Sequence, residues 1–305
     1  MNRIDLTDID LLDFVGKQES QFIVPFKEFG DDIHERFENG VALFGDDLPW
    51  IKTHDKFRLR PGEVSIWAGV NGHGKSIVTS HVAAHLCKTR KVLIASLEMP
   101  IPATGHRMIR QIAGNSKPPT KFIDDIINWT NERIFLYDEL DTVESERILG
   151  LCIYAFSQLG INHIFIDSLM KCGIAPDDYS KQKSFIDELC AIAKNYNMNI
   201  HLVAHMRKPP VDKRYIPNRY DIAGGSDITN QADNIFICWS DVEKNRERAK
   251  PEHMQDKEIM SRPCQIFAIE KQREGEDSMR FALNFDPRSL QMIDGKRIDY
   301  WENFK

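Results

Sequence analysis

The chain has 305 residues, a formal net charge of −6, a hydrophobic content of 42% and a charged content of 28%, which are typical of an ordinary globular protein. Its six cysteines are scattered singly with no C-x-x-C pair, so neither a structural zinc site nor a disulfide framework is expected. No apolar run approaches the roughly 20 residues that span a bilayer, and the N-terminus is acidic, so we expect a cytoplasmic protein without a membrane partner.

The front of the chain is acidic and separate in character. Residues 1–50 hold 12 acidic and 4 basic side chains, which leaves a net charge of +2 for the remainder. An amphipathic pattern over residues 4–18 predicts a short helix, packed either on its own domain or on a neighbouring subunit. Residues 19–60 are interrupted by Gly30, Gly40, Gly45 and Pro49 and are predicted to be irregular. We therefore expect an arm or linker over 1–50, either packed on its own domain or subunit-bridging, and one large domain over 51–305.

From residue 61 the pattern alternates between apolar strands and helices. Strands are predicted at 64–68, 91–97, 133–137, 163–167, 200–205, 234–239, 264–270 and 279–285. Helices are predicted from the end of the stretch 69–76 through 87 and near 101–113, 120–130, 142–159 and 178–197. Such alternation with short connections predicts an α/β fold with a doubly wound, mostly parallel sheet flanked by helices.

A phosphate-binding loop follows the first of these strands. The stretch GVNGHGKS at 69–76 fits G-x-x-x-x-G-K-S and lies between a strand and a helix. Its glycines let backbone N–H groups point at a phosphate chain, and the helix adds its positive end. Lys75 would reach the β- and γ-phosphates of ATP or another NTP, and Ser76 would hold Mg²⁺. The candidate nucleotide-binding residues are Gly69, Asn71, Gly72, His73, Gly74, Lys75 and Ser76.

Three further polar residues stand where predicted strands end, the edge at which ligands bind in such sheets. Asp167 matches the strand-end acid that holds magnesium beside a phosphate loop. Glu98 is placed to orient and deprotonate the water that attacks the γ-phosphate, or is an acid in the first turn of a helix. His205 could contact the γ-phosphate and report its loss, or be a satisfied polar residue.

Two downstream segments carry clustered cations. The loop 207–220 interleaves basic residues with two tyrosines, which favours contact with single-stranded nucleic acid over a solvated loop; the basic residues are Arg207, Lys208, Lys213, Arg214 and Arg219. Residues 243–262 mix six basic with five acidic side chains and are predicted to be a solvated charged loop.

Lys271 and Arg273 lie one residue apart at the end of a predicted strand, so their side chains point the same way. Both could face one phosphate chain, including that of another subunit, where an arginine stabilises the transition state of hydrolysis. The alternative is a surface ion pair with Glu270 or Glu274.

Together these motifs resemble the RecA-fold motor domain of DnaB-like replicative helicases, with closest similarity to the phage and mitochondrial Twinkle branch. The matching stretches occur in the family's order and are AGVNGHGKS, SLEMP, IFIDSLMKC, HLVAHMRKP, DIAGGSDITNQADNIF and KQREG. The resemblance implies a Mg²⁺-dependent NTPase and helicase motor over residues 51–305. It further implies a homo-hexameric ring that moves along single-stranded DNA and hydrolyses NTP between subunits.

Residue by residue, the resemblance gives Glu98 the catalytic carboxylate, Asp167 the metal-side acid and His205 the phosphate sensor. Arg273, supported by Lys271, matches the finger supplied to the neighbour's site.

The DNA-contacting region of the family matches Arg207 and the segment Gly224, Gly225 and Ser226, although Ala223 stands where the family usually has an arginine. A separate primase, loader or single-strand-binding protein is the expected partner, and the host cytoplasm the expected location if the chain is phage-encoded. Two other readings stay open at this point. One is a RecA-fold DNA-binding ATPase without unwinding activity, of the recombinase or annealing type. The other is a nucleotide-switched scaffold.

Overall fold

The computed structural model describes residues 25–39, 44–207, 215–224, 226–275 and 278–300. The predicted helix at 4–18 lies outside them. Contacts divide the chain into two units, Met1–Val41 and Ala42–Lys305. In the first unit, a 3₁₀ turn at Phe26–Phe29 leads into helix α2, Gly30–Asn39. The prediction of irregular structure is wrong there, because Asp31 places negative charge at the positive end of a helix and Ile33 and Phe37 recur at helical spacing.

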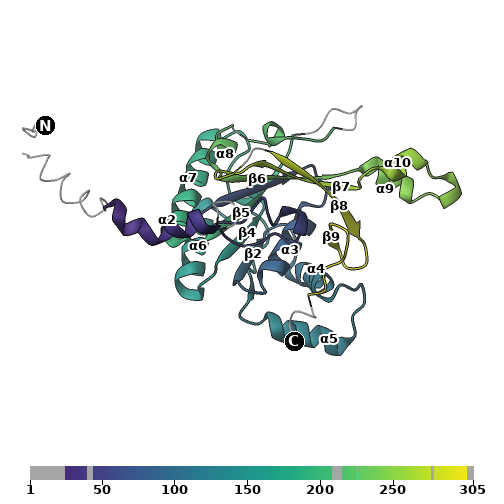
Figure 1. Cartoon of the computed structure of the whole chain (residues 1–305), viewed down its shortest axis with the longest axis horizontal. Helices are drawn as coiled ribbons and strands as arrows, with labels where there is room; N and C mark the ends of the chain where they lie inside the picture. Colours follow the sequence, from purple (N-terminus) through teal and green to yellow (C-terminus); the bar gives the residue numbers. More distant parts are fainter. Residues whose placement is uncertain (1–24, 40–43, 208–214, 225, 276–277, 301–305) are drawn as a thin grey trace, which may run out of the picture. The chain divides into compact units, whose positions relative to one another are not determined.

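The second unit is built on a nine-stranded sheet with the strand order β3-β2-β4-β5-β1-β6-β7-β8-β9 (Figure 1). The strands are β1 Val64–Gly69, β2 Val92–Ser96, β3 Ile134–Leu136, β4 His163–Asp167, β5 Asn199–His205, β6 Asn234–Ser240, β7 Gln265–Lys271, β8 Met279–Asp286 and β9 Gln291–Ile293. The strands from β3 to β6 in this order pair in parallel, and the last three join antiparallel. The predicted mostly parallel α/β sheet is confirmed, whereas β9 was not predicted.

Helices cover both faces of the sheet. One core contains residues of α6 Ser145–Leu159, α7 Tyr179–Tyr196 and α8 Ser226–Gln231, and the other contains residues of α3 Lys75–Leu86, α4 Ile101–Ala113 and α5 Thr120–Thr130. Strand β1 serves both cores, because Ile66 faces the first and Trp67 the second, as alternation along a strand requires. Among the described residues, no helix is both long enough and apolar enough to traverse a bilayer.

The region predicted to be a solvated charged loop contains two short helices beyond β6. They are α9 Val242–Arg248 and α10 Lys257–Ser261, with a 3₁₀ turn at Glu252–Met254 between them. The prediction of a loop is wrong because aspartates cap both helices: Asp241 accepts from the backbone N–H of Lys244, and Asp256 from that of Ile259.

A buried chain of polar groups runs across the neighbouring strands β1, β5 and β4. Trp67 donates its indole N–H to Nδ1 of His201 at 3.2 Å, and Nε2 of His201 lies 3.1 Å from Nδ1 of His163. Nε2 of His163 lies 3.0 Å from Asp46, which also pairs with Arg90. Because the tryptophan can only donate, each neutral imidazole accepts a hydrogen bond on one ring nitrogen and donates one from the other, in the direction of the Asp46 carboxylate. Burial lowers the pKa of both histidines, so this neutral arrangement is favoured.

Candidate nucleotide site

The phosphate loop lies where β1 ends and α3 begins, as predicted. Gly72 and Gly74 have φ of +80° and +86°, which only glycine adopts readily. Gly69 lies so close to β6 that a Cβ there would meet the carbonyl oxygen of Cys238 at 2.4 Å. The Nζ of Lys75 donates to the carbonyl of Gly69 at 2.9 Å, and burial lowers the pKa of this ammonium. The cation is thus inside the loop, next to the place where phosphates would bind.

His73 fixes the loop to the neighbouring strand. Its Nδ1 accepts a hydrogen bond from the backbone N–H of Ser240 at 3.2 Å, at the end of β6. Burial is the main cause that lowers the pKa of His73, and the charge of Lys75 adds to it. The neutral ring therefore links the loop to β6 through an acceptor nitrogen.

The two candidate metal ligands meet directly. Ser76 donates its hydroxyl to Oδ2 of Asp167 at 2.6 Å, so α3 and β4 bring a hydroxyl and a carboxylate oxygen together. Desolvation raises the pKa of Asp167, since the carboxylate lies in a poorly hydrated place. Hard oxygen donors of this kind suit Mg²⁺, and a divalent cation would offset the cost of that buried negative charge. No cluster of three or more His, Cys, Asp or Glu that could hold a metal occurs in the described part of the chain, so phosphate oxygens and water would complete the coordination.

Glu98 belongs to a hydrogen-bonded group at the same edge. Ser168 donates to its Oε1, and Nε2 of His205 lies 3.3 Å from that oxygen. The hydrogen bond from His205 is the largest cause that brings the pKa of Glu98 to about 2. The other ring nitrogen of His205 lies 2.5 Å from Oδ1 of Asn71 in the phosphate loop. Helix α4 begins at Ile101, so Glu98 precedes its first turn and the alternative of a first-turn acid is wrong.

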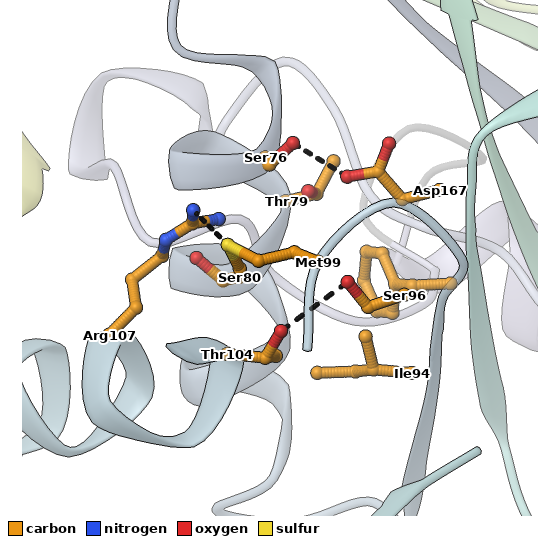
Figure 2. A pocket seen from close by; sticks show the side chains of 10 residues that line it. Ser76, Thr79, Ser80, Ile94, Ser96, Met99, Thr104, Arg107 and Asp167 are labelled. Atoms are coloured by element: carbon orange, nitrogen blue, oxygen red, sulfur yellow. Dashed lines mark hydrogen bonds between the residues drawn. The ribbon is translucent and has the colours of Figure 1, made fainter. Parts of the chain in front are cut away.

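Ser168 was missed by sequence reasoning, and so was Arg107 of α4. A small cavity of about 20 Å³ beside the metal ligands is shown in Figure 2. Arg107 lies at this cavity and donates to the sulfur of Met99 at 3.0 Å, a weak acceptor. Desolvation lowers its pKa, whereas the nearby charge of Asp167 raises it. The available signal in the sequence was a basic residue, Arg107, within the helix predicted at 101–113 that follows Glu98. The cavity is lined by Ser76, Thr79, Ser80, Ile94, Ser96, Met99, Thr104, Arg107, Phe165 and Asp167.

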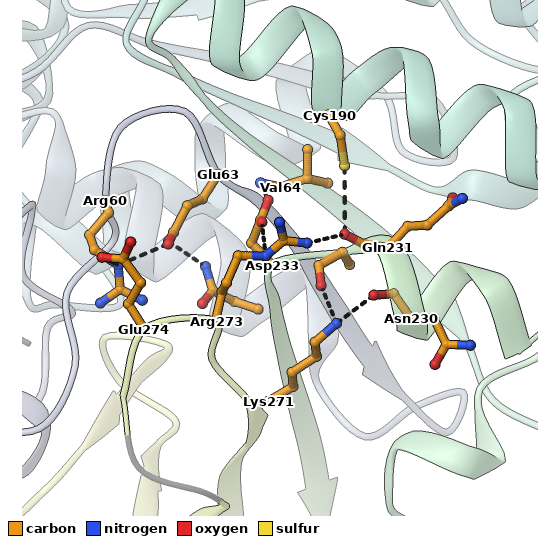
Figure 3. Close-up of polar contacts among 12 residues, drawn as sticks. Arg60, Glu63, Val64, Cys190, Asn230, Gln231, Asp233, Lys271, Arg273 and Glu274 are labelled. Atoms are coloured by element: carbon orange, nitrogen blue, oxygen red, sulfur yellow. Dashed lines mark hydrogen bonds and ion pairs between the residues drawn. The ribbon is translucent and has the colours of Figure 1, made fainter. Parts of the chain in front are cut away.

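Lys271 and Arg273 lie at the opposite edge of the sheet. Strand β7 runs antiparallel to β6, so its last residue pairs with Ile235 near the start of β6. Figure 3 shows both cations directed at the C-terminal end of α8. Arg273 pairs with Asp233 at 2.7 Å. The alternative of a pair with Glu270 or Glu274 is therefore wrong.

The candidate DNA-contacting residues are described in part, because Lys208, Lys213, Arg214 and Gly225 lie outside the described residues. Arg207 donates to the carbonyl of Gly224 at 3.4 Å, and its backbone N–H to that of Asp221 at 2.8 Å. Arg219 lies over the ring of Tyr220, with the guanidinium carbon 5.0 Å from the ring centroid. Ser226 begins α8. The structure thus joins Arg207 to the glycine segment, while Arg219 stacks on an exposed tyrosine.

Comparisons with known proteins agree with this geometry. A family model described as "AAA domain" matches residues 50–211, which hold the phosphate loop, Glu98, Asp167 and His205. The Twinkle homolog protein, chloroplastic/mitochondrial, of Arabidopsis thaliana is 20% identical over 249 residues, which are 72% of this chain and 34% of that protein. The chain thus spans about a third of the length of the curated relative it matches.

Two solved structures share the fold. The "ATPase Domain of G40P" matches with a TM-score of 0.73 at 14% identity, over 90% of this chain and all of that one. A structure titled "The Structure Of A DnaB-Like Replicative Helicase And Its Interactions With Primase" matches with a TM-score of 0.69 at 15% identity, over 89% of this chain and 67% of that one. The predicted fold of a DnaB-like motor domain is confirmed. The phosphate loop, the acid that follows it and the matched family model together show that this chain belongs to the AAA domain family.

Proposed function

We propose that this chain is the motor subunit of a replicative DNA helicase, which hydrolyses NTP with Mg²⁺ and moves along single-stranded DNA as a ring. In this proposal residues 51–305 are the motor and residues 1–50 an arm that bridges subunits. A hexamer, a separate primase, a loader and a single-strand-binding protein are the proposed partners, and the host cytoplasm the proposed location.

The positions of the nucleotide site and of Arg273 on opposite edges of the sheet support assembly into a ring. The nucleotide site lies at the carboxyl edge of the parallel strands, whereas Lys271 and Arg273 lie where β6 begins. Strand β6 has seven residues, so about 20 Å separates the two edges. An arginine side chain cannot cross that distance within its own subunit. Arg273 can serve hydrolysis only in a neighbour's site, which requires an assembly with repeated head-to-tail contacts.

The residues of the site divide the work of phosphoryl transfer. Lys75 and the N–H groups of the loop would bind the β- and γ-phosphates, and Ser76 and Asp167 would hold Mg²⁺, which supplies charge neutralisation on the phosphate oxygens. Glu98 stays ionised at neutral pH because its pKa is about 2, and would orient the attacking water.

His205 connects these parts, since its two ring nitrogens contact the loop residue Asn71 and the acid Glu98. A γ-phosphate that binds beside this imidazole would compete for the same hydrogen bonds. Loss of the phosphate after hydrolysis would restore them, which is the expected behaviour of a sensor.

Binding of DNA is assigned to Arg207, Arg219 and the segment 224–226, together with Lys208, Lys213 and Arg214. The backbone supports this assignment: Ala223 donates its N–H to the carbonyl of His205 at 2.9 Å. A backbone hydrogen bond therefore joins the proposed sensor to the residue directly before Gly224.

The test is strand displacement on a forked duplex, with hydrolysis measured in parallel with and without poly-dT. Displacement that needs NTP and Mg²⁺ and is lost in Arg273→Ala supports the proposal. An equimolar mixture of Arg273→Ala and Lys75→Ala chains should recover part of the hydrolysis, because each supplies what the other lacks at mixed interfaces. Hydrolysis stimulated by DNA without displacement at any partner composition would favour a recombinase or annealing ATPase. Turnover unchanged in Glu98→Gln would instead favour a nucleotide-switched scaffold.

A further inference from the structure

The two cations assigned to the neighbour's site are held within this chain, by the end of α8 and the two residues that follow it. The Nζ of Lys271 donates to the carbonyls of Thr229, Asn230 and Ala232 at 3.0, 2.7 and 2.7 Å. An ammonium has three N–H donors, so all three are used. These carbonyls lie at the end of a helix, where the backbone carries partial negative charge.

Arg273 is held by the residue that follows. Its Nε pairs with Oδ1 of Asp233 at 2.7 Å, and its Nη2 donates to the carbonyl of Gln231 at 3.2 Å. The Asp233 side chain is 2% exposed and also accepts the backbone N–H of Val64 at 2.9 Å, at the start of β1. A carboxylate that is buried and fixed to the sheet is a firm anchor, whereas the Arg273 side chain is 48% exposed and can leave.

The other end of α8 adjoins the candidate DNA-binding segment. The helix has six residues and is about 9 Å long, so its two ends are mechanically close. A Cβ on Gly224 would lie 2.6 Å from Oε1 of Gln182 and 2.6 Å from Cδ1 of Ile228, which belong to α7 and α8. Gly224 is therefore packed directly on α8, and a shift of its backbone towards Ile228 would push the helix.

We propose that α8 is a latch. In the free subunit the carbonyls at its C-terminal end hold Lys271 and, together with Asp233, Arg273. Single-stranded DNA bound beside Gly224 shifts the helix and withdraws these carbonyls. Lys271 is then free, and Arg273, left on Asp233 alone, can pass to the neighbour's triphosphate. Asp233 is the positioning residue of this latch. The proposal rests on the proposed motor function and adds how DNA regulates hydrolysis: without DNA, the finger stays on its own subunit.

The variant Asp233→Asn tests the latch. Asparagine keeps an oxygen that accepts the N–H of Val64, but it lacks the charge that holds Arg273. Hydrolysis without DNA should rise about fivefold, a factor in keeping with the loss of one part-exposed ion pair, while stimulation by poly-dT falls by the same factor. The matched control is Glu270→Gln, which removes the neighbouring ion pair with Arg280, at 3.1 Å, and should change neither rate. An unchanged ratio of the two rates in Asp233→Asn would overturn the proposal.

A second readout needs no hydrolysis and is made on the wild-type chain, with a conservative variant used only for assignment. The side-chain ¹⁵Nε resonance of Arg273 in the wild-type chain, assigned through Arg273→Lys, should show slow exchange of its hydrogen-bonded proton. Addition of poly-dT with a non-hydrolysable NTP analogue should shift the resonance. An exchange rate equal to that of free arginine, or no response to DNA and analogue, would refute the latch. Absent NTP hydrolysis in the wild type would refute the motor, so the two failures are distinct.

Discussion

The close approach of β1 and β6 makes Gly69→Ala a test of the phosphate loop. The added Cβ would lie 2.4 Å from the carbonyl oxygen of Cys238 and 3.1 Å from Cγ of Lys75. Because the first atom belongs to the backbone of a paired strand, the start of the loop must move by about 1 Å to reach ordinary contact distance. Overpacking of this kind costs about 1–3 kcal/mol, against which the reduced entropy of the unfolded chain returns about 0.4–1 kcal/mol.

We therefore expect Gly69→Ala to lower the free energy of unfolding by about 1–2 kcal/mol, or the melting temperature by about 2–8 °C. The affinity for a fluorescent ATP analogue should fall as well, because the displaced loop carries the Lys75 stem. The matched control is Gly105→Ala in α4, where a Cβ meets nothing within 4 Å. That change should stabilise the chain by about 0.5–1 kcal/mol through helix propensity. Equal melting temperatures and nucleotide affinities for wild type and Gly69→Ala would contradict the steric argument.

Three further outcomes are expected. Lys75→Ala should abolish hydrolysis, measured as phosphate release, and retained turnover would remove the assignment of the site. Ser168→Ala should raise the pKa of Glu98 from about 2 towards its ordinary value. In the wild type the lowered pKa of Glu98 stabilises the folded state above the unfolded pKa of this carboxyl, and the stabilisation is lost as the pH falls towards 2. In the variant the stabilisation should be lost at a higher pH. Carboxyl ¹³C titration of Glu98 measures the shift, and an unchanged midpoint would exclude Ser168 as a cause of the low pKa. His163→Phe should cost about 1–3 kcal/mol in urea unfolding, because His201 keeps a buried donor without an acceptor, and a smaller loss would show that the chain of imidazoles relaxes.

The elements predicted best from sequence are those whose signal is local. The apolar run before Gly69 and the motif that follows it specify strand, loop and helix within about 20 residues. The strand-end acid Asp167 was recognised from the mostly apolar residues before it together with the phosphate loop upstream. Strand β9 escaped because three residues carry no periodicity. Helices α9 and α10 were not predicted because their charge balance resembles that of a solvated loop. Their N-terminal aspartate caps were the available sequence signal.

Contacts between distant parts of the chain could not be predicted. The pairing of Arg273 with Asp233 depends on the antiparallel register of β6 and β7, which joins residues 40 apart. Likewise, the contact of His205 with Asn71 needs β5 and β1 to be neighbours, an order that no local pattern specifies. Ser168 shows the opposite case, since a hydroxyl directly after the strand-end acid was visible in the sequence but has many other uses.

Strand β6 touches both functional edges of the subunit. At one end the N–H of Ser240 donates to His73 of the phosphate loop, and at the other the strand directly follows Asp233, which pairs with Arg273, the residue proposed to enter the next subunit's site. In the proposed ring, seven residues of hydrogen-bonded backbone would therefore form a stiff rod between one nucleotide and the next. In a hexamer, the six β6 strands, connected through the subunit interfaces, would link all the nucleotide sites around the DNA. A displacement of the phosphate loop at one nucleotide would be transmitted along β6 to the adjacent site. Such coupling would favour NTP hydrolysis by the subunits in sequence over independent hydrolysis.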